Sequence, residues 1–121
     1  AITAAGGKAE AIAVDLYDMT AVRTLADQLA ADSRHIDQLV NAAGTFFPKP
    51  FLEHGEADYD RYMDLNRATF FLTQAVARNM AAHGGGAIVN IGSMWARQAI
   101  KATPSSAYSM AKAGLHSLTQ H

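Results

Sequence analysis

The stretch IDQLVNAAG, residues 36–44, carries the pattern that decides the fold. Its apolar run from Ile36 to Val40 predicts a short buried strand. The polar and small residues from Asn41 to Gly44 follow that strand directly and predict a turn. Ligands of open α/β sheets bind outside the carboxyl ends of the strands, so this turn is a candidate binding segment.

The same pattern returns after a long helical segment. Residues 55–82 place apolar and small side chains near one face at helical spacing, and the glycines at 84–86 end that pattern. Residues 87–91 then form a second apolar run, which predicts another strand. A strand, a helix and a strand in this order predict two parallel strands joined by a right-handed crossover.

One further strand and two further helices complete the predicted order. Residues 9–16 (AEAIAVDL) predict a buried strand, and residues 19–32 predict a helix with one apolar stripe. Residues 92–104 predict a loop closed by a proline, and residues 106–121 predict a last helix. Alternating strands and helices predict an α/β fold, namely a Rossmann-like, doubly wound parallel sheet with three α/β/α layers, here incomplete.

The composition is that of an ordinary globular domain. Half of the 121 residues are hydrophobic and 17% are charged, with 10 Lys and Arg against 11 Asp and Glu. We expect no nucleic acid partner and no membrane, because the sequence has neither a basic stripe nor an apolar run of membrane-spanning length. The lack of cysteine predicts a reducing compartment, the cytoplasm. The histidines lack ligand spacing, so we expect no metal site.

Both ends of the sequence predict an internal fragment of a longer protein. The chain starts without Met, and its Ala-rich beginning stops at Gly6 and Gly7, which is typical of the C-terminal end of a helix. The last predicted helix reaches His121 without a stop signal. We therefore expect further segments on both sides.

Tyr108 and Lys112 stand one turn apart in the last predicted helix, which places their side chains on the same face. A free tyrosine has a pKa of about 10, and a fixed cation nearby favours the phenolate. Such a pair can exchange a proton with a substrate near neutral pH. The alternative for this spacing alone is a packed tyrosine beside a solvated lysine.

Ser93 and Asn66 are the polar residues that join this pair. Ser93 follows the strand 87–91, where its hydroxyl either donates to a substrate oxygen or forms a turn. Asn66 lies on the apolar stripe of the helix 55–82, where its amide needs a hydrogen-bonding partner. That partner is either a buried water, which would relay protons toward Lys112, or a backbone carbonyl in a distorted turn. A structural amide without a catalytic part is the alternative.

Together these residues resemble those of the short-chain dehydrogenase/reductase family in order and approximate spacing, over essentially the whole chain. The resemblance implies that Tyr108 is the general acid or base and that Ser93 orients the carbonyl. It also implies that Lys112 binds the nicotinamide ribose and stabilises the phenolate, and that Asn66 holds the relay water.

The same resemblance assigns the cofactor-binding residues. Asp15 would accept a hydrogen bond from the adenine amino group, with Leu16 beside it. The turn after the strand resembles the family's Asn-Asn-Ala-Gly motif, which lines the cofactor and steadies the central strand. That turn consists here of Asn41, Ala42, Ala43 and Gly44. Tyr108 and Lys112 would complete the cofactor site.

Three features depart from the family pattern. The family's glycine-rich phosphate-binding turn and its C-terminal substrate lid are absent, and the glycines at 84–86 do not replace that turn because they follow a helix. Ala42 replaces the second Asn of the motif.

The interval from Ser93 to Tyr108 is slightly longer than usual, which implies a larger loop at the substrate mouth. We expect substrate contacts from that loop, and the alternative is a loop folded on its own Trp. The candidate residues are Met94, Trp95, Arg97, Gln98 and Ile100.

The resemblance implies an oxidoreductase that transfers a hydride between NAD or NADP and a small-molecule carbonyl or secondary alcohol, as a homodimer or homotetramer. Residues 1–121 would hold the third to fifth strands of its NAD(P)-binding Rossmann domain. The alternatives are a non-catalytic Rossmann-type nucleotide-binding or sensor protein and an inactive truncated product. In the order 3-2-1-4-5-6 the third strand lacks its neighbour here, so we expect these residues alone to be unstable and inactive.

Overall fold

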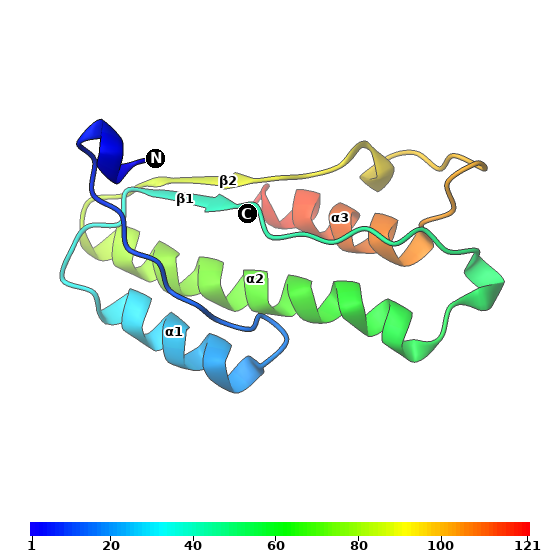
Figure 1. Ribbon diagram of the computed structural model, residues 1–121, viewed down its shortest axis with the longest axis horizontal. Coiled ribbons are helices and arrows are strands. Elements are labelled where there is room, and N and C mark those ends of the chain that lie inside the picture. The colour runs from blue at the N-terminus through cyan, green and yellow to red at the C-terminus, as the bar shows by residue number, and fades with distance from the viewer.

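Two short parallel strands form the sheet of this protein. In the computed structural model, which describes residues 1–121, β1 (Gln38–Asn41) pairs with β2 (Ala87–Asn90). Their register sets Asn41 opposite Asn90, and both strands point the same way (Figure 1). The predicted parallel crossover is therefore confirmed.

Three α-helices accompany the strands: α1 (Met19–Ala31), α2 (Glu56–Ala82) and α3 (Ser106–Leu118). Asp18 begins α1, because its carboxylate accepts hydrogen bonds from the backbone N–H groups of Thr20 and Ala21 at 2.8 and 3.3 Å. All three helices lie where the sequence predicts them, although the last one ends at Leu118 and not at His121. None of them combines the length and the apolar character that crossing a membrane requires.

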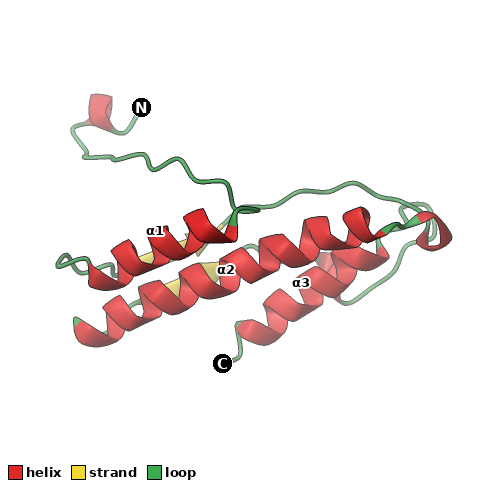
Figure 2. Cartoon of the chain, turned by 90° about the horizontal axis from the view of Figure 1, so that it is seen from below, coloured by secondary structure: helices red, strands yellow, loops and turns green.

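All three helices cover the same face of the sheet (Figures 1 and 2). Leu39 and Ile88 turn toward the helices and are half-buried, whereas Val40 and Val89 on the opposite face are 58% and 51% exposed. Right-handed crossovers that run in one direction along a sheet place their helices on one side. The chain therefore holds two of the three predicted layers, the sheet and one helix layer, as expected of an incomplete Rossmann-like fold.

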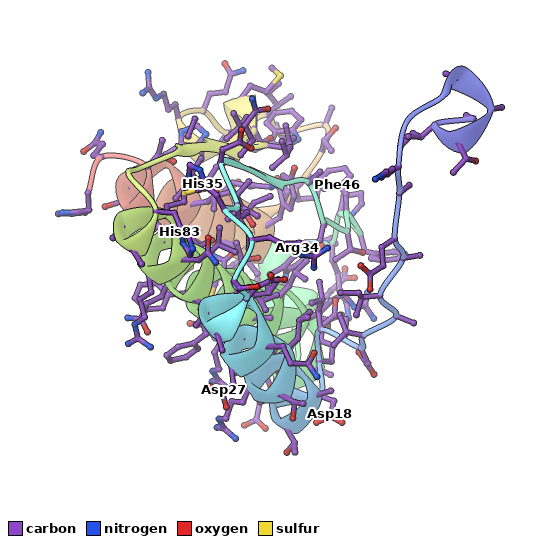
Figure 3. The ribbon with its side chains drawn as sticks, turned by 90° about the vertical axis from the view of Figure 1, so that its left-hand side faces the viewer. Asp18, Asp27, Arg34, His35, Phe46 and His83 are labelled. Atoms are coloured by element: carbon purple, nitrogen blue, oxygen red, sulfur yellow. The ribbon has the colours of Figure 1, made fainter.

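The prediction of a strand at residues 9–16 is wrong for this chain. Residues 7–15 have no regular secondary structure, and Figures 2 and 3 show this segment standing apart from the helices. A strand needs a neighbour for its backbone hydrogen bonds, and the structure supplies none here. The preceding helix end is confirmed as a single 3-10 turn, Thr3–Ala5, which Gly6 closes at a φ of 80°.

The core is thin and runs along α2. Only 11 of the 121 residues are buried. Val22 of α1 packs there with no exposed surface, and Tyr62 of α2 forms a cluster with Ala107 and Ala111 of α3. Most of the stabilising burial therefore lies between helices, and little of it involves the sheet.

Asn79 connects α2 to the loop between α1 and β1. Its side chain is fully buried; Oδ1 accepts a hydrogen bond from the backbone N–H of Ile36 at 2.9 Å, and Nδ2 donates to the carbonyls of Asp32 and Arg34 at 2.8 and 3.1 Å. In the same loop, the hydrogen bond from the Arg34 guanidinium lowers the pKa of Asp32 to about 2. Asn79 was not predicted from the sequence, although a polar side chain on the apolar face of a helix was the feature that could have revealed it.

We expect the 121 residues alone to show no cooperative thermal unfolding. A two-stranded sheet with one open apolar face and so few buried residues does not hold a domain together. Circular dichroism at 222 nm during heating would then give a gradual slope. A sharp sigmoidal transition of the monomeric chain would contradict this expectation.

Substitution of Asn79 by Ala should destabilise the full-length protein by about 2–3 kcal/mol, because the change leaves buried backbone groups without partners. Chemical denaturation of both proteins measures the difference. Gln74→Ala on the exposed side of the same helix is the control and should change stability by less than about 0.5 kcal/mol. Equal effects of the two changes would show that the Asn79 contacts contribute no stability.

Candidate active site

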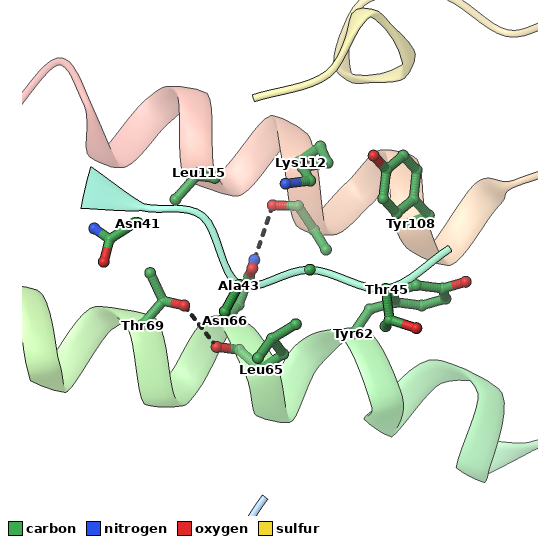
Figure 4. A pocket seen from close by; sticks show the side chains of 12 residues that line it. Asn41, Ala43, Thr45, Tyr62, Leu65, Asn66, Thr69, Tyr108, Lys112 and Leu115 are labelled. Carbon is green, nitrogen blue, oxygen red and sulfur yellow. Dashed lines mark hydrogen bonds between the residues drawn. The ribbon is translucent and has the colours of Figure 1, made fainter. Parts of the chain in front are cut away.

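The carboxyl ends of β1 and β2 meet the start of α3, and two hollows lie at this junction. A narrow one lies between residues 41–45, α2 and α3 (Figure 4). An open one of about 270 Å³ lies between residues 42–46 and residues 91–92. Tyr108 and Lys112 line both hollows, so the helical spacing of the pair brings the two side chains together as predicted.

Aromatic contacts brace Tyr108 from two sides. The ring of Phe46 meets it edge-on with the centroids 4.8 Å apart, and the ring of Tyr62 does so at 5.7 Å. Tyr62 is itself fixed, because its hydroxyl accepts a hydrogen bond from the backbone N–H of Phe47 at 2.9 Å and donates to the carbonyl of that residue at 3.1 Å. The phenol of Tyr108 is therefore positioned by both the segment after β1 and α2.

Lys112 connects α3 to the end of β2. Its Nζ donates a hydrogen bond to the backbone carbonyl of Ile91 at 2.7 Å and lies 5.8 Å from the centroid of the Tyr108 ring. The ammonium group is thus held between the phenol and the sheet edge.

Asn66 has a hydrogen-bonding partner, as its position requires, and that partner is a backbone carbonyl. Its Nδ2 donates to the backbone carbonyl of Ala111 at 2.8 Å, so α2 is joined to α3 one residue before Lys112 (Figure 4). The carbonyl belongs to the neighbouring helix α3 and not to a distorted turn, and the relay water stays a prediction. The contact places Asn66 beside Tyr108 and Lys112 in the narrow hollow.

Ser93 does not line either hollow. It begins a single 3-10 turn, Met94–Ala96, and its Oγ accepts a hydrogen bond from the backbone N–H of Trp95 at 3.3 Å. Its own backbone N–H donates to Nε2 of His116 on α3 at 3.3 Å. The turn-forming role considered for Ser93 is therefore present in the structure.

Asp15 and Leu16 lie apart from these hollows. Neither residue lines them, and Oδ1 of Asp15 accepts a hydrogen bond from the backbone N–H of Tyr17 at 2.9 Å. Both residues lie at the end of the segment 9–16, which lacks a neighbouring strand, so nothing in this chain holds them against the end of β1.

The loop before α3 encloses a third hollow of about 550 Å³. Four of the five residues predicted to contact the substrate line it, namely Trp95, Arg97, Gln98 and Ile100, whereas Met94 is 59% exposed and does not. Its polar lining also includes residues that were not predicted to contact the substrate, namely Lys101, Thr103, Ser105, Ser106 and Ser109.

Lys49 holds the segment after β1 against this loop. Its backbone N–H donates to the carbonyl of Pro104 at 2.9 Å, and its Nζ pairs with Asp58 of α2 at 2.7 Å. The hydrogen bond from Lys49 lowers the pKa of Asp58, and a second one from the backbone of Gly55 lowers it further. Lys49 thus joins the segment after β1 and the loop before α3 to α2.

A polar network under the sheet includes residues that the sequence analysis missed. Nδ2 of Asn41 donates to Thr73 of α2 and to Oδ1 of Asn90, both at 2.8 Å. Nδ2 of Asn90 in turn donates to Thr119 at 2.9 Å. The sequence signal was a polar Asn90 inside the second apolar run, residues 87–91, at the place where Asn41 follows the first run. No group of three or more potential metal-ligating side chains converges in the structure.

The sequence profile of the family described as "short chain dehydrogenase" matches residues 1–121. This chain belongs to the short-chain dehydrogenase family. It is 37% identical over 121 residues to 2-dehydro-3-deoxy-D-gluconate 5-dehydrogenase of Escherichia coli (strain K12), a match that covers 98% of this chain and 47% of that protein. It is 39% identical over 95 residues to D-threitol dehydrogenase of Mycolicibacterium smegmatis, which covers 78% of this chain and 36% of that protein.

Solved structures agree with this assignment. A gluconate 5-dehydrogenase from Burkholderia cenocepacia, crystallised in complex with NADP and tartrate, matches with a TM-score of 0.84 at 31% identity. The match covers 98% of this chain and 46% of that one. This short-chain dehydrogenase sequence therefore spans about half the length of the relatives it matches.

Proposed function

We propose that the full-length protein is an NAD(P)-dependent oxidoreductase that interconverts a carbonyl and a secondary alcohol, with Tyr108 as its general acid and base. The observation that carries this proposal is the convergence of Tyr108 and Lys112 on hollows at the carboxyl ends of two parallel strands. The activities of the relatives support the reaction class, since those proteins are dehydrogenases of alcohols and sugar acids.

The residues present fit a nicotinamide cofactor. The small, exposed residues Ala42 and Gly44 border the open hollow, Ala43 borders the narrow one, and all three allow close approach of a ligand. Lys112 supplies a cation for the ribose hydroxyls. Asp15 and Leu16 are the proposed partners of the adenine, in a protein in which their segment has a neighbouring strand. When bound, the nicotinamide supplies or accepts the hydride.

The remaining chemistry belongs to the side chains of this chain. In the reducing direction, the hydroxyl of Tyr108 gives its proton to the substrate oxygen, and in the oxidising direction it takes that proton back. Lys112, one turn away, holds its ammonium group 5.8 Å from the centroid of the Tyr108 ring. Oγ of Ser93 accepts a hydrogen bond from Trp95, which leaves its own proton available for the substrate oxygen. The hydrogen bond from Asn66 to the carbonyl of Ala111 joins α2 to α3 next to Tyr108 and Lys112.

We propose that the substrate is polyhydroxylated and carries an anionic group. The loop hollow contains two cations, Arg97 and Lys101, and no acid lines it. Neither cation pairs with a carboxylate in the structure. Hydroxyl and amide side chains form most of the remaining polar lining, which suits the hydroxyls of a sugar acid. Ser109, which follows Tyr108 directly in α3, is one of the residues that line this hollow.

We also propose that the protein is a homo-oligomer whose contacts involve α2 and α3. The outer surfaces of these helices expose large apolar side chains, among them Phe70, Phe71 and Met110, at 43–57%. The cytoplasm stays a prediction from the absence of cysteine.

Tyr108→Phe should lower kcat of the full-length protein by at least about 1000-fold, because the change removes the proton that the substrate oxygen needs. The binding constant for NADPH or NADH, measured by cofactor fluorescence, should change less than about threefold. Tyr59→Phe, a phenol on the exposed side of α2, is the control and should keep full activity. Turnover by Tyr108→Phe at the wild-type rate would refute the proton transfer, and a wild-type protein that binds cofactor without turnover would support the sensor alternative.

The paired substrates D-gluconate and D-sorbitol test the anionic group, since they differ chiefly in the carboxylate. We expect a higher kcat/KM for the acid, and the double change Arg97→Gln and Lys101→Gln should lower that value about 10-fold or more while leaving the value for sorbitol unchanged. Arg23→Gln on α1 is the matched control, with no effect on either substrate. Equal losses for both substrates would contradict an anion-binding role of the loop.

A further inference from the structure

The end of β2 is held by two side chains of α3 that stand one turn apart. Lys112 donates to the carbonyl of Ile91, and Nε2 of His116 accepts a hydrogen bond from the backbone N–H of Ser93. The residue between these two contacts is Gly92. The helix that carries Tyr108 therefore contacts consecutive peptide units that lead into Ser93.

Gly92 fits against His116 because it has no side chain. A Cβ at this position would overlap Nε2 of the imidazole, so the ring lies directly against the backbone. The φ of Gly92 is not in the left-handed region, which means that space and not backbone conformation requires glycine here. Gly92 and His116 are thus complementary in shape.

The hydrogen bond also defines the chemical state of the imidazole. A backbone N–H donates, so Nε2 must carry no proton and act as the acceptor, and in a neutral ring the proton is then on Nδ1. Ala at position 116 would remove both the acceptor and the surface against which Gly92 packs. Gln offers an amide oxygen that can accept the same hydrogen bond from a longer, more flexible side chain.

We propose that His116 is a positioning residue, which fixes the Gly92–Ser93 backbone and thereby the hydroxyl of Ser93 relative to Tyr108 and Lys112. This inference rests on the proposed oxidoreductase function. His116 lines neither hollow of the site, so we expect it to act through Ser93. Its effect should therefore appear in kcat and should depend on the presence of the Ser93 hydroxyl.

A double-mutant cycle in the full-length protein tests the proposal. His116→Ala should lower kcat about 10-fold, since a misplacement of about 1 Å is enough for such a loss, and should leave the affinity for NADPH unchanged. In a Ser93→Ala background, His116→Ala should cause no further loss of kcat. His116→Gln should recover part of the activity, and Ser117→Ala on the exposed side of the same helix is the control.

The cycle separates failure of this inference from failure of the proposed function. A kcat of His116→Ala within twofold of wild type, or an equal loss with and without Ser93, would overturn the positioning role. Absence of turnover in the wild-type protein would instead contradict the proposed function.

A second cycle tests the contact without any assay of activity. Gly92→Ala should lower the Tm of the full-length protein. The same change should lower Tm much less in a His116→Ala background, because the overlapping ring is then gone. Equal shifts of Tm in both backgrounds would show that the two residues do not pack as inferred.

Discussion

The parallel pairing of β1 with β2 is the constraint on which the rest of the structure depends. Parallel strands require a long crossover, and α2 supplies it along the full length of the sheet. The same pairing brings both carboxyl ends to one edge, where α3 begins. The site exists because three segments that are distant in sequence, the ends of the two strands and the start of α3, must meet there.

Four side-chain amides, of which Asn79 is fully buried and Asn41, Asn66 and Asn90 are half-buried, fix the register of this arrangement. Asn41 and Asn90 occupy opposite positions of the two strands and share a hydrogen bond, while Asn66 and Asn79 connect α2 to α3 and to the loop before β1. Loss of a hydrogen bond is costly where the amide is shielded from water, most of all at Asn79, so these contacts penalise a shifted arrangement. Because so few residues are buried, these hydrogen bonds fix the relative positions of the helices and strands more than apolar packing does.

The candidate site depends on these same supports. Tyr108 lies between aromatic rings that α2 and the segment after β1 hold in place, and Lys112 is fixed by the carbonyl of Ile91. Ser93 receives its position from the end of β2 and from His116. Proton transfer requires such fixed geometry, because a donor is useful only where the charge on the substrate oxygen develops.

The sequence by itself determined the local features: the helices α1, α2 and α3, the two short apolar strands, and the common helical face of Tyr108 and Lys112. These depend on spacing and on side-chain chemistry within one element. Only the tertiary structure decided what depends on a neighbour. Residues 9–16 have strand composition but no partner strand, Asn66 bonds to another helix, and Ser93 turns toward His116 because α3 passes beneath Gly92. Hydrogen bonds between segments are properties of pairs, and a single stretch of sequence contains only one member of each pair.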